Sequence, residues 1–176
     1  MTLEARIARS HGMDDEAWAR HANPWSVWTR VPILPLLALA AWSRDWIGWW
    51  AVVPVVLLLA WTWINPRFFP PPASLDSWES RAVLGERLWL ARGEVPVPAR
   101  HRVLPARLNA LSAAGGLLLL YGLGWLVPWA ALTGLLVALL AKLWFLDRMT
   151  WLVADMRDDP RLLAWQAAGT RIPPAG

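Results

Sequence analysis

The chain contains no cysteine and little histidine, phenylalanine or tyrosine. Its 176 residues include three His, three Phe and one Tyr, whereas Trp occurs 16 times. The absence of Cys excludes disulfides, thiolate metal sites and cysteine nucleophiles. Charged residues make up 17%, against about a quarter in ordinary soluble domains, and hydrophobic residues reach 57%. A soluble domain of this length has no core large enough for so many indoles, so the composition argues against an ordinary soluble enzyme.

Four apolar stretches dominate the sequence, at 24–43, 46–64, 105–127 and 129–147. Each has about 20 residues, enough at ~1.5 Å per residue to cross a hydrocarbon core of ~30 Å. Because lipid offers no partner to backbone N–H and C=O groups, such stretches must be helical. Groups of Trp flank them, as expected for indoles at a membrane surface. We predict an all-α polytopic membrane protein with four transmembrane helices, arranged as two antiparallel hairpins, plus cytoplasmic interfacial helices.

The four predicted spans divide one membrane domain, 1–176, into further segments. Residues 1–23 form an amphipathic N-terminus, residues 65–104 a linker with an interfacial helix over 75–92, and residues 148–176 the C-terminus. Sixteen of the 17 Lys and Arg residues fall on the side of these segments, and Arg44 alone falls on the hairpin side. Basic residues mark the cytoplasmic side of a membrane. We therefore predict a multi-pass cell (inner) membrane protein with both termini cytoplasmic.

The excess of basic residues has a second possible meaning, which their placement decides. The net charge is +4 and the isoelectric point is about 10.9, values compatible with nucleic-acid binding. The basic residues, however, line one membrane face, where anionic headgroups attract them. We therefore expect membrane lipid as a partner, and no nucleic acid.

Asparagine and proline suggest where the predicted helices begin, end and bend. Asn23-Pro24 is typical of an N-cap followed by the first helical residue, and it predicts the start of the first span. Asn65-Pro66 predicts the end of the second span. Pro54 removes a backbone hydrogen bond inside that span and predicts a kink.

Small residues recur on the last two spans. The third carries Ser112, Gly116 and Gly124, and the fourth carries small residues at every fourth position, namely Ala130, Gly134 and Ala138. Small residues at this spacing let helix backbones approach closely in lipid. They predict either a contact between the third and fourth spans or a face for a homo-oligomer or protein partner.

Polar residues that could carry chemistry lie in the cytoplasmic segments. Two glutamates of the 75–92 helix have no basic residue three or four positions away, and two histidines could join them in a metal or an acid–base site. The catalytic candidates are therefore His21, Glu79, Glu86 and His101. The binding candidates are Arg30, Asn65, Arg67, Arg87, Arg102, Lys142, Asp147 and Arg148. A structural role, as loop caps or contacts with lipid phosphate, is an equally simple interpretation of these residues.

Cofactor and metal sites are not indicated by the sequence. No histidine lies within a span, which disfavours a transmembrane haem with two His ligands. Asp147 and Asp155, two turns apart, are more typical of a solvated or Arg-paired face than of a metal site. We expect neither a cofactor nor a bound metal.

Several short runs resemble a known family. They are HANPWSVWTR (21–30), WSR (42–44), WIGWW (46–50), NPR (65–67) and GERLWL (85–90). In combination they resemble a domain-of-unknown-function family of small tryptophan-rich prokaryotic integral membrane proteins, over roughly residues 20–157. The resemblance implies a prokaryotic membrane location and supplies no catalytic residues.

Three functional hypotheses follow. The first is a structural or lipid- or partner-binding role at the cytoplasmic membrane face. The second is an enzyme that acts on a lipid-soluble substrate with the four catalytic candidates. The third is a small transporter or channel subunit, for which Lys142 and the Pro54 kink are the hints. The sequence leaves open whether the protein is an enzyme.

Overall fold

The computed structural model describes residues 15–171, and these residues form helices joined by turns, without a strand. The elements are α2 (Asp15–His21), α3 (Pro24–Trp28), α4 (Ile33–Trp42), α5 (Arg44–Ile47), η1 (Gly48–Ala51), α6 (Val52–Phe68), α7 (Trp78–Leu90), η2 (Ala99–His101), α8 (Val103–Gly124), α9 (Pro128–Asp155) and α10 (Pro160–Arg171). The prediction of an all-α chain is confirmed. The predicted amphipathic N-terminus and the cytoplasmic C-terminus lie partly outside the described residues.

The described residues group into two compact units. Unit 1 comprises 15–28, 65–103 and 146–171, and unit 2 comprises 29–64 and 104–145. Helices α6, α8 and α9 each contribute residues to both units. The sequence predicted one membrane domain without this subdivision.

Three helical stretches among the described residues are long and apolar enough to cross a membrane. They cover Pro24–Phe68, Ala99–Gly124 and Pro128–Asp155, with lengths of 45, 26 and 28 residues. The second and third contain the predicted spans 105–127 and 129–147 almost entirely. The first contains both 24–43 and 46–64, and it is made of several elements rather than one helix.

The predicted continuous helix over 24–43 is wrong, because the structure has a break after α3. Asn23 caps α3 as predicted, since its Oδ1 accepts a hydrogen bond from the Trp25 N–H at 2.9 Å. Residues 29–32 then form turns before α4 begins at Ile33. Pro32 has no N–H for the Trp28 carbonyl, so the helix cannot continue through it with full hydrogen bonding.

Pro54, inside the second predicted span, and Pro66, just after it, also act differently from the prediction. Gly48, with φ of 58°, and the η1 turn separate α5 from α6, so Pro54 is the third residue of a new helix. A proline in the first turn costs no hydrogen bond, and the reason for a kink there disappears. Pro66 lies inside α6, which ends at Phe68, so Asn65-Pro66 does not end the helix.

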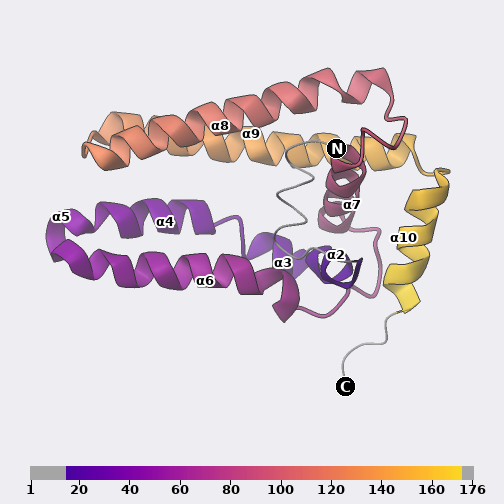
Figure 1. Cartoon of the computed structure of the whole chain (residues 1–176), viewed down its shortest axis with the longest axis horizontal. Coiled ribbons are helices and arrows are strands. Elements are labelled where there is room, and N and C mark those ends of the chain that lie inside the picture. Colours follow the sequence, from indigo (N-terminus) through magenta and orange to yellow (C-terminus); the bar gives the residue numbers. More distant parts are fainter. Residues whose placement is uncertain (1–14, 172–176) are drawn as a thin grey trace. The chain divides into compact units, whose positions relative to one another are not determined.

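In unit 2, α8 and α9 lie side by side (Figure 1) and touch through their backbones. A Cβ added at Gly115 would come within 2.5 Å of the Ala138 backbone nitrogen. A Cβ at Gly134 would meet the backbone nitrogen of Leu119, and one at Gly122 would meet that of Ala131. Rising residue numbers on α8 thus pair with falling numbers on α9, which makes the two helices antiparallel.

The small residues of α9 form this contact as predicted, but those of α8 do so only in part. Ala130, Gly134 and Ala138 are buried. On α8, Ser112 donates a hydrogen bond to the Ala138 carbonyl at 3.0 Å, whereas a Cβ at Gly116 or Gly124 would meet nothing within 4 Å. The seam on α8 runs through positions 112, 115, 119 and 122, the alternating three–four spacing of two helices packed lengthwise. The assignment of Gly116 and Gly124 to this contact is therefore wrong.

A tight turn connects α8 to α9. The Val127 N–H donates to the Gly122 carbonyl at 2.8 Å, and Leu126 has a φ of 53°. This pattern is that of a helix end closed by one left-handed residue, a position usually taken by glycine. A side chain in that conformation costs about 1 kcal/mol.

Unit 1 is built on the packing of α7 against the C-terminal part of α9. Ser77 caps α7, since its Oγ accepts a hydrogen bond from the Ser80 N–H at 3.2 Å, and the helix ends at Leu90, within the predicted 75–92. A Cβ at Gly85 would meet the Met149 carbonyl, which shows a close crossing of α7 and α9. The core of unit 1 is formed by fully buried apolar side chains, among them Leu88, Trp89, Val97, Met149, Leu152 and Leu162.

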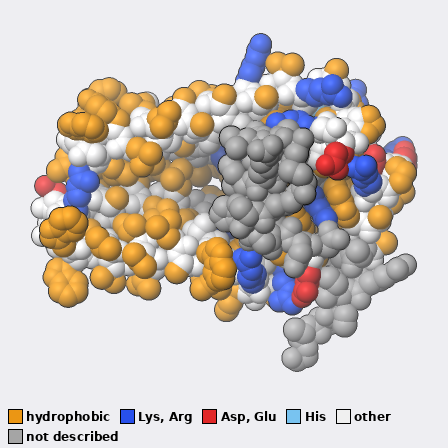
Figure 2. All heavy atoms as spheres, viewed as in Figure 1, with side chains coloured by type: hydrophobic (Ala, Val, Ile, Leu, Met, Phe, Trp, Pro, Cys, Tyr) orange, Lys and Arg blue, Asp and Glu red, His pale blue; other side chains and the backbone are white. Residues whose placement is uncertain are grey.

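Unit 2 has the opposite surface character. It contains five charged residues, Arg30, Arg44, Asp45, Arg107 and Lys142, of the 17 basic and 13 acidic residues in the chain. Figure 2 shows hydrophobic side chains over the helices of this unit. Large apolar side chains stand exposed on all four of its long helices, for example Leu39, Leu57, Leu117 and Leu140. Contiguous apolar surface of this kind marks a contact with membrane or protein.

The helix seam of unit 2 gives a matched pair of substitutions. We expect Gly115→Ala to lower the free energy of unfolding by about 1–3 kcal/mol, because the new methyl group must push the α9 backbone away. Gly116→Ala, one residue further on the same helix, should be neutral or stabilising by up to about 1 kcal/mol, because its Cβ enters open space. Thermal unfolding in detergent measures both. Equal effects of the two substitutions would contradict the close contact at Gly115.

Candidate functional site

The first polar cluster of unit 1 joins η2 to the end of α9. His101 Nε2 lies 2.5 Å from Asp155 Oδ2, and Arg100 contacts the same oxygen through Nη2 at 2.7 Å and Nε at 2.9 Å. His101 is buried, whereas Asp155 is an exposed residue whose side chain is 28% accessible. One carboxylate oxygen thus receives two side chains from the segment that precedes α8. The arrangement ties this segment to α9, and it gives His101 a partner that the sequence analysis did not pair with it.

A second cluster surrounds Glu79 at the start of α7. The Trp28 indole N–H donates to Glu79 Oε1, and the Trp28 ring stacks on the Trp78 ring at a centroid distance of 6.2 Å. Partial burial raises the pKa of the Glu79 carboxyl, but hydrogen bonds from its own backbone N–H, from Trp28 and from Ser77 together outweigh that rise. The pKa of Glu79 therefore lies below its ordinary value of 4.5. The partner that its own helix lacks comes from α3.

Asp147 and Arg148 lie on α9 near the same tryptophan. Trp78 Nε1 is 3.5 Å from Asp147 Oδ1, at the outer limit of a hydrogen bond, and Arg148 Nη2 lies 3.0 Å from Asp147 Oδ2. The Arg148 guanidinium also stands 4.8 Å from the centre of the Trp151 ring. This is the Arg-paired face that the sequence analysis weighed against a metal site.

Asn65 and Arg67 belong to a buried link between the end of α6 and residues 20–26. Asn65 is fully buried, and the Ser26 hydroxyl donates to its Oδ1 at 2.8 Å. The Arg67 carbonyl accepts a hydrogen bond from Arg20 Nη1 at 3.3 Å. A buried amide bonded in this way is typical of a group that positions the chain.

Arg87 connects three helices through aromatic rings. Its guanidinium carbon lies 4.0 Å from the centre of the Trp165 ring on α10 and 5.8 Å from that of Trp18 on α2. His21 contacts the Trp18 ring edge-on, with a centroid distance of 5.6 Å. Stacking of a guanidinium on indoles is favourable, and here it holds α2 and α10 on α7. Arg87 and His21 therefore share one aromatic cluster.

The remaining candidates are spread over both units. Arg102 donates from Nε to the Val97 carbonyl at 2.9 Å, and Glu86 is half-buried on α7. Lys142 and Arg30 belong to unit 2. Lys142 Nζ lies 4.6 Å from the centre of the Phe145 ring.

Three of the four catalytic candidates contact different side chains. Glu79 is joined to Trp28, His101 to Asp155, and His21 packs on Trp18. Within residues 15–171, no group of three or more His, Asp or Glu side chains is arranged to hold a metal ion. The contact of Glu79 with Trp28 joins α7 to α3, and that of His101 with Asp155 joins η2 to α9, whereas the contact of His21 with Trp18 lies within α2.

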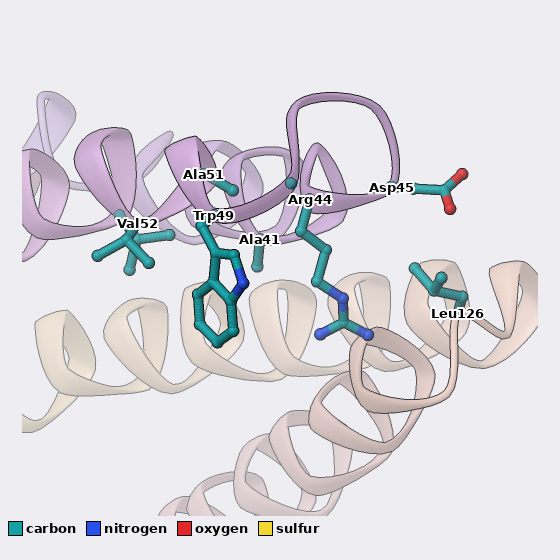
Figure 3. Close-up of a pocket in the computed structure, with 9 residues that line it drawn as sticks. Ala41, Arg44, Asp45, Trp49, Ala51, Val52 and Leu126 are labelled. Carbon is teal, nitrogen blue, oxygen red and sulfur yellow. The ribbon is translucent and has the colours of Figure 1, made fainter.

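One feature that the sequence analysis missed is a pocket in unit 2. It has a volume of about 500 Å³ and lies where α4, α5, η1 and the first turns of α6 meet the turn after α8. Ala41, Ala51, Val52, Val55 and Leu126 supply apolar walls, and Arg44, Asp45 and Trp49 supply the polar groups. Figure 3 shows the Arg44 and Trp49 side chains on one side of the ribbon and Asp45 directed elsewhere. The sequence signal that could have indicated this pocket is the run WSRDWIGWW (42–50), because it places one arginine among several tryptophans.

A family assignment follows from comparison of the chain with known protein families. It belongs to a family of unknown function, DUF6653, which matches residues 2–170. The resemblance drawn from the tryptophan and Asn-Pro runs is thereby confirmed as membership in a family without an assigned activity. Neither the curated proteins nor the solved structures include a match.

The lowered pKa of Glu79 leads to a prediction on acid stability. A carboxyl whose pKa is lower in the folded than in the unfolded chain adds stability above pH 4.5, and this contribution is lost as the pH falls through the folded-state pKa. We expect Glu79→Gln to reduce the fall in unfolding temperature between pH 6 and about pH 3, because the ionised partner of Trp28 is gone. Trp28→Phe, which keeps a ring but removes the indole donor, should act in the same direction. An unchanged pH profile in both variants would contradict the assignment.

Proposed function

We propose that the protein crosses the cell membrane four times, as two antiparallel hairpins, and binds lipid headgroups or a partner protein at its cytoplasmic face. The observation that supports this most is the division of charge between the units. Unit 2 has five charged residues and exposes large apolar side chains on every long helix. In water such a surface would associate, whereas in a bilayer it faces hydrocarbon.

The length of the first apolar stretch supports two spans in place of one. A continuous helix of 45 residues would be about 65 Å long, twice the ~30 Å of a hydrocarbon core. This stretch is interrupted between Trp42 and Val52, and the interruption contains two charged residues, Arg44 and Asp45. A hairpin with Arg44 and Asp45 at its tip accounts for both the length and the break.

The distribution of basic residues supports the orientation. Unit 1 carries most of the chain's arginines, and Arg81, Arg100, Arg157 and Arg161 are exposed on it. Each basic side chain near an anionic membrane contributes about 1 kcal/mol of attraction. Unit 1 is therefore suited to lie at the cytoplasmic headgroups, with its internal polar contacts holding its helices together.

The absence of cysteine allows a direct test of the topology. Single-cysteine variants at exposed positions report one site each, and a membrane-impermeant maleimide labels those outside the cell. We expect Asp45→Cys to react in intact cells, and Gly93→Cys and Asp158→Cys to react only after permeabilisation. Labelling of Gly93→Cys and Asp158→Cys from opposite sides would require an odd number of spans between them and would contradict the four-span arrangement.

The binding part of the proposal has its own test. We expect the protein, purified in native lipid, to retain a larger fraction of anionic lipid than the whole membrane contains. Alternatively, a photoreactive group at the exposed Arg81 position should capture a lipid or a protein. The same protein without the photoreactive group is the control for capture. Neither enrichment nor capture would contradict a binding role at the cytoplasmic face, and it would leave the topology unaffected.

A further inference from the structure

The pocket of unit 2 contains a cation with unused hydrogen-bonding capacity. Arg44 donates through Nη2 to the Gly124 carbonyl at 2.8 Å and to the Leu123 carbonyl. Within the described residues, the recorded hydrogen bonds of Arg44 all use Nη2, so Nε and Nη1 keep their donors. Two carbonyls at the end of α8 thus hold the guanidinium in place, and its Nη1 group is available to a ligand.

The groups around Arg44 determine which ligand fits. Five of the nine lining residues are the apolar Ala41, Ala51, Val52, Val55 and Leu126, and Trp49 is 91% exposed. In Figure 3 the Asp45 carboxylate points away from the guanidinium, and no ion pair between the two is recorded within the described residues. A volume of about 500 Å³ falls in the range of ligand pockets, about 300–1,000 Å³. The site combines a fixed cation, an indole donor and an apolar wall.

We propose that this pocket binds one anionic phospholipid from the outer leaflet. One phosphate oxygen accepts a hydrogen bond from Arg44 Nη1 and another accepts one from the Trp49 indole N–H, and the first part of an acyl chain lies against Val52 and Val55. A hydrogen bond from a guanidinium to a phosphate is charge-assisted and therefore strong, and an indole at a headgroup is favourable. The proposal rests on the proposed membrane placement, because that placement puts Arg44 at the outer headgroup level.

Arg44 is distinctive in this position because other basic residues are absent from the predicted outer side. A scattered attraction of anionic lipid by many arginines is the expectation for unit 1, and it gives no defined stoichiometry. A single fixed guanidinium beside an apolar wall predicts one lipid per chain. The stoichiometry therefore separates this site from the general attraction at the cytoplasmic face.

The experiment is a lipid titration of the full chain in detergent, with bound lipid counted by native mass spectrometry. The probe is phosphatidylglycerol, with phosphatidylcholine and inorganic phosphate as separate arms. Val55→Trp fills the pocket, and Val56→Trp adds the same bulk to a neighbouring α6 residue that is 54% exposed and outside the pocket. Arg44→Gln removes the cation. Thermal unfolding of each variant checks the fold.

We expect one saturable phosphatidylglycerol per chain in the wild type and in Val56→Trp. The affinity should fall about tenfold or more in Arg44→Gln, because a charged hydrogen bond is removed, and by a similar factor in Val55→Trp, because the indole occupies the space of the acyl chain. Phosphatidylcholine, whose headgroup has no net charge, should bind more weakly. Because Arg44→Gln also removes the contact with α8, the pair Val55→Trp and Val56→Trp decides the matter if that variant fails to fold.

Three results would overturn the proposal. They are equal phosphatidylglycerol binding by Val55→Trp and Val56→Trp, binding without saturation, and inorganic phosphate that competes as well as the lipid. A protein that labels with the four-span pattern but gives any of these results refutes the lipid site alone. A protein that fails the labelling test refutes the proposed function first.

Discussion

The constraint on which unit 2 depends is that polar groups on an apolar surface must be satisfied from within. Thr62 donates to the Leu58 carbonyl, Ser43 to the Ala40 carbonyl and Ser112 to the Ala138 carbonyl. Arg44 does so in part, since its Nη2 donates to two carbonyls at the end of α8. Each of these bonds uses a backbone oxygen nearby, so the unit can expose its apolar side chains without leaving these donor atoms unpaired. Unit 1, in contrast, joins distant helices through its polar side chains.

Local sequence signals predicted the helices but not all of their ends. Apolar length predicted the stretches at 105–127 and 129–147, and Asn23-Pro24 predicted the cap of α3, because these features act within one turn or one span. Pro66 misled the prediction, since a proline near the end of a helix removes one hydrogen bond without preventing the last residues from remaining helical. Gly48 had the opposite effect: its left-handed backbone starts a new helix and makes Pro54 harmless.

Contacts between elements were beyond a single sequence. Small residues correctly predicted that α9 packs closely, but Gly115 and Gly116 are indistinguishable by composition, and only the packing shows which one faces α9. The sequence shows that Glu79 has no basic partner within its own helix, but it does not show that Trp28, 51 positions away, is its partner. His101 and Asp155 are 54 positions apart, and each could be named without any sign that they meet. Residue type marks a polar group as costly, and the fold decides its partner.

The turn at Leu126 has a consequence for how the chain tolerates insertions and deletions. One left-handed residue reverses the chain there, and the bond from Val127 to Gly122 leaves no slack between α8 and α9. Adding a single residue at the start of α9 would rotate every later position of that helix by about 100°. The rotation would move the small residues of α9, namely Ala130, Gly134 and Ala138, out of contact with the glycines of α8. Length variation in this family should therefore avoid the turn between α8 and α9.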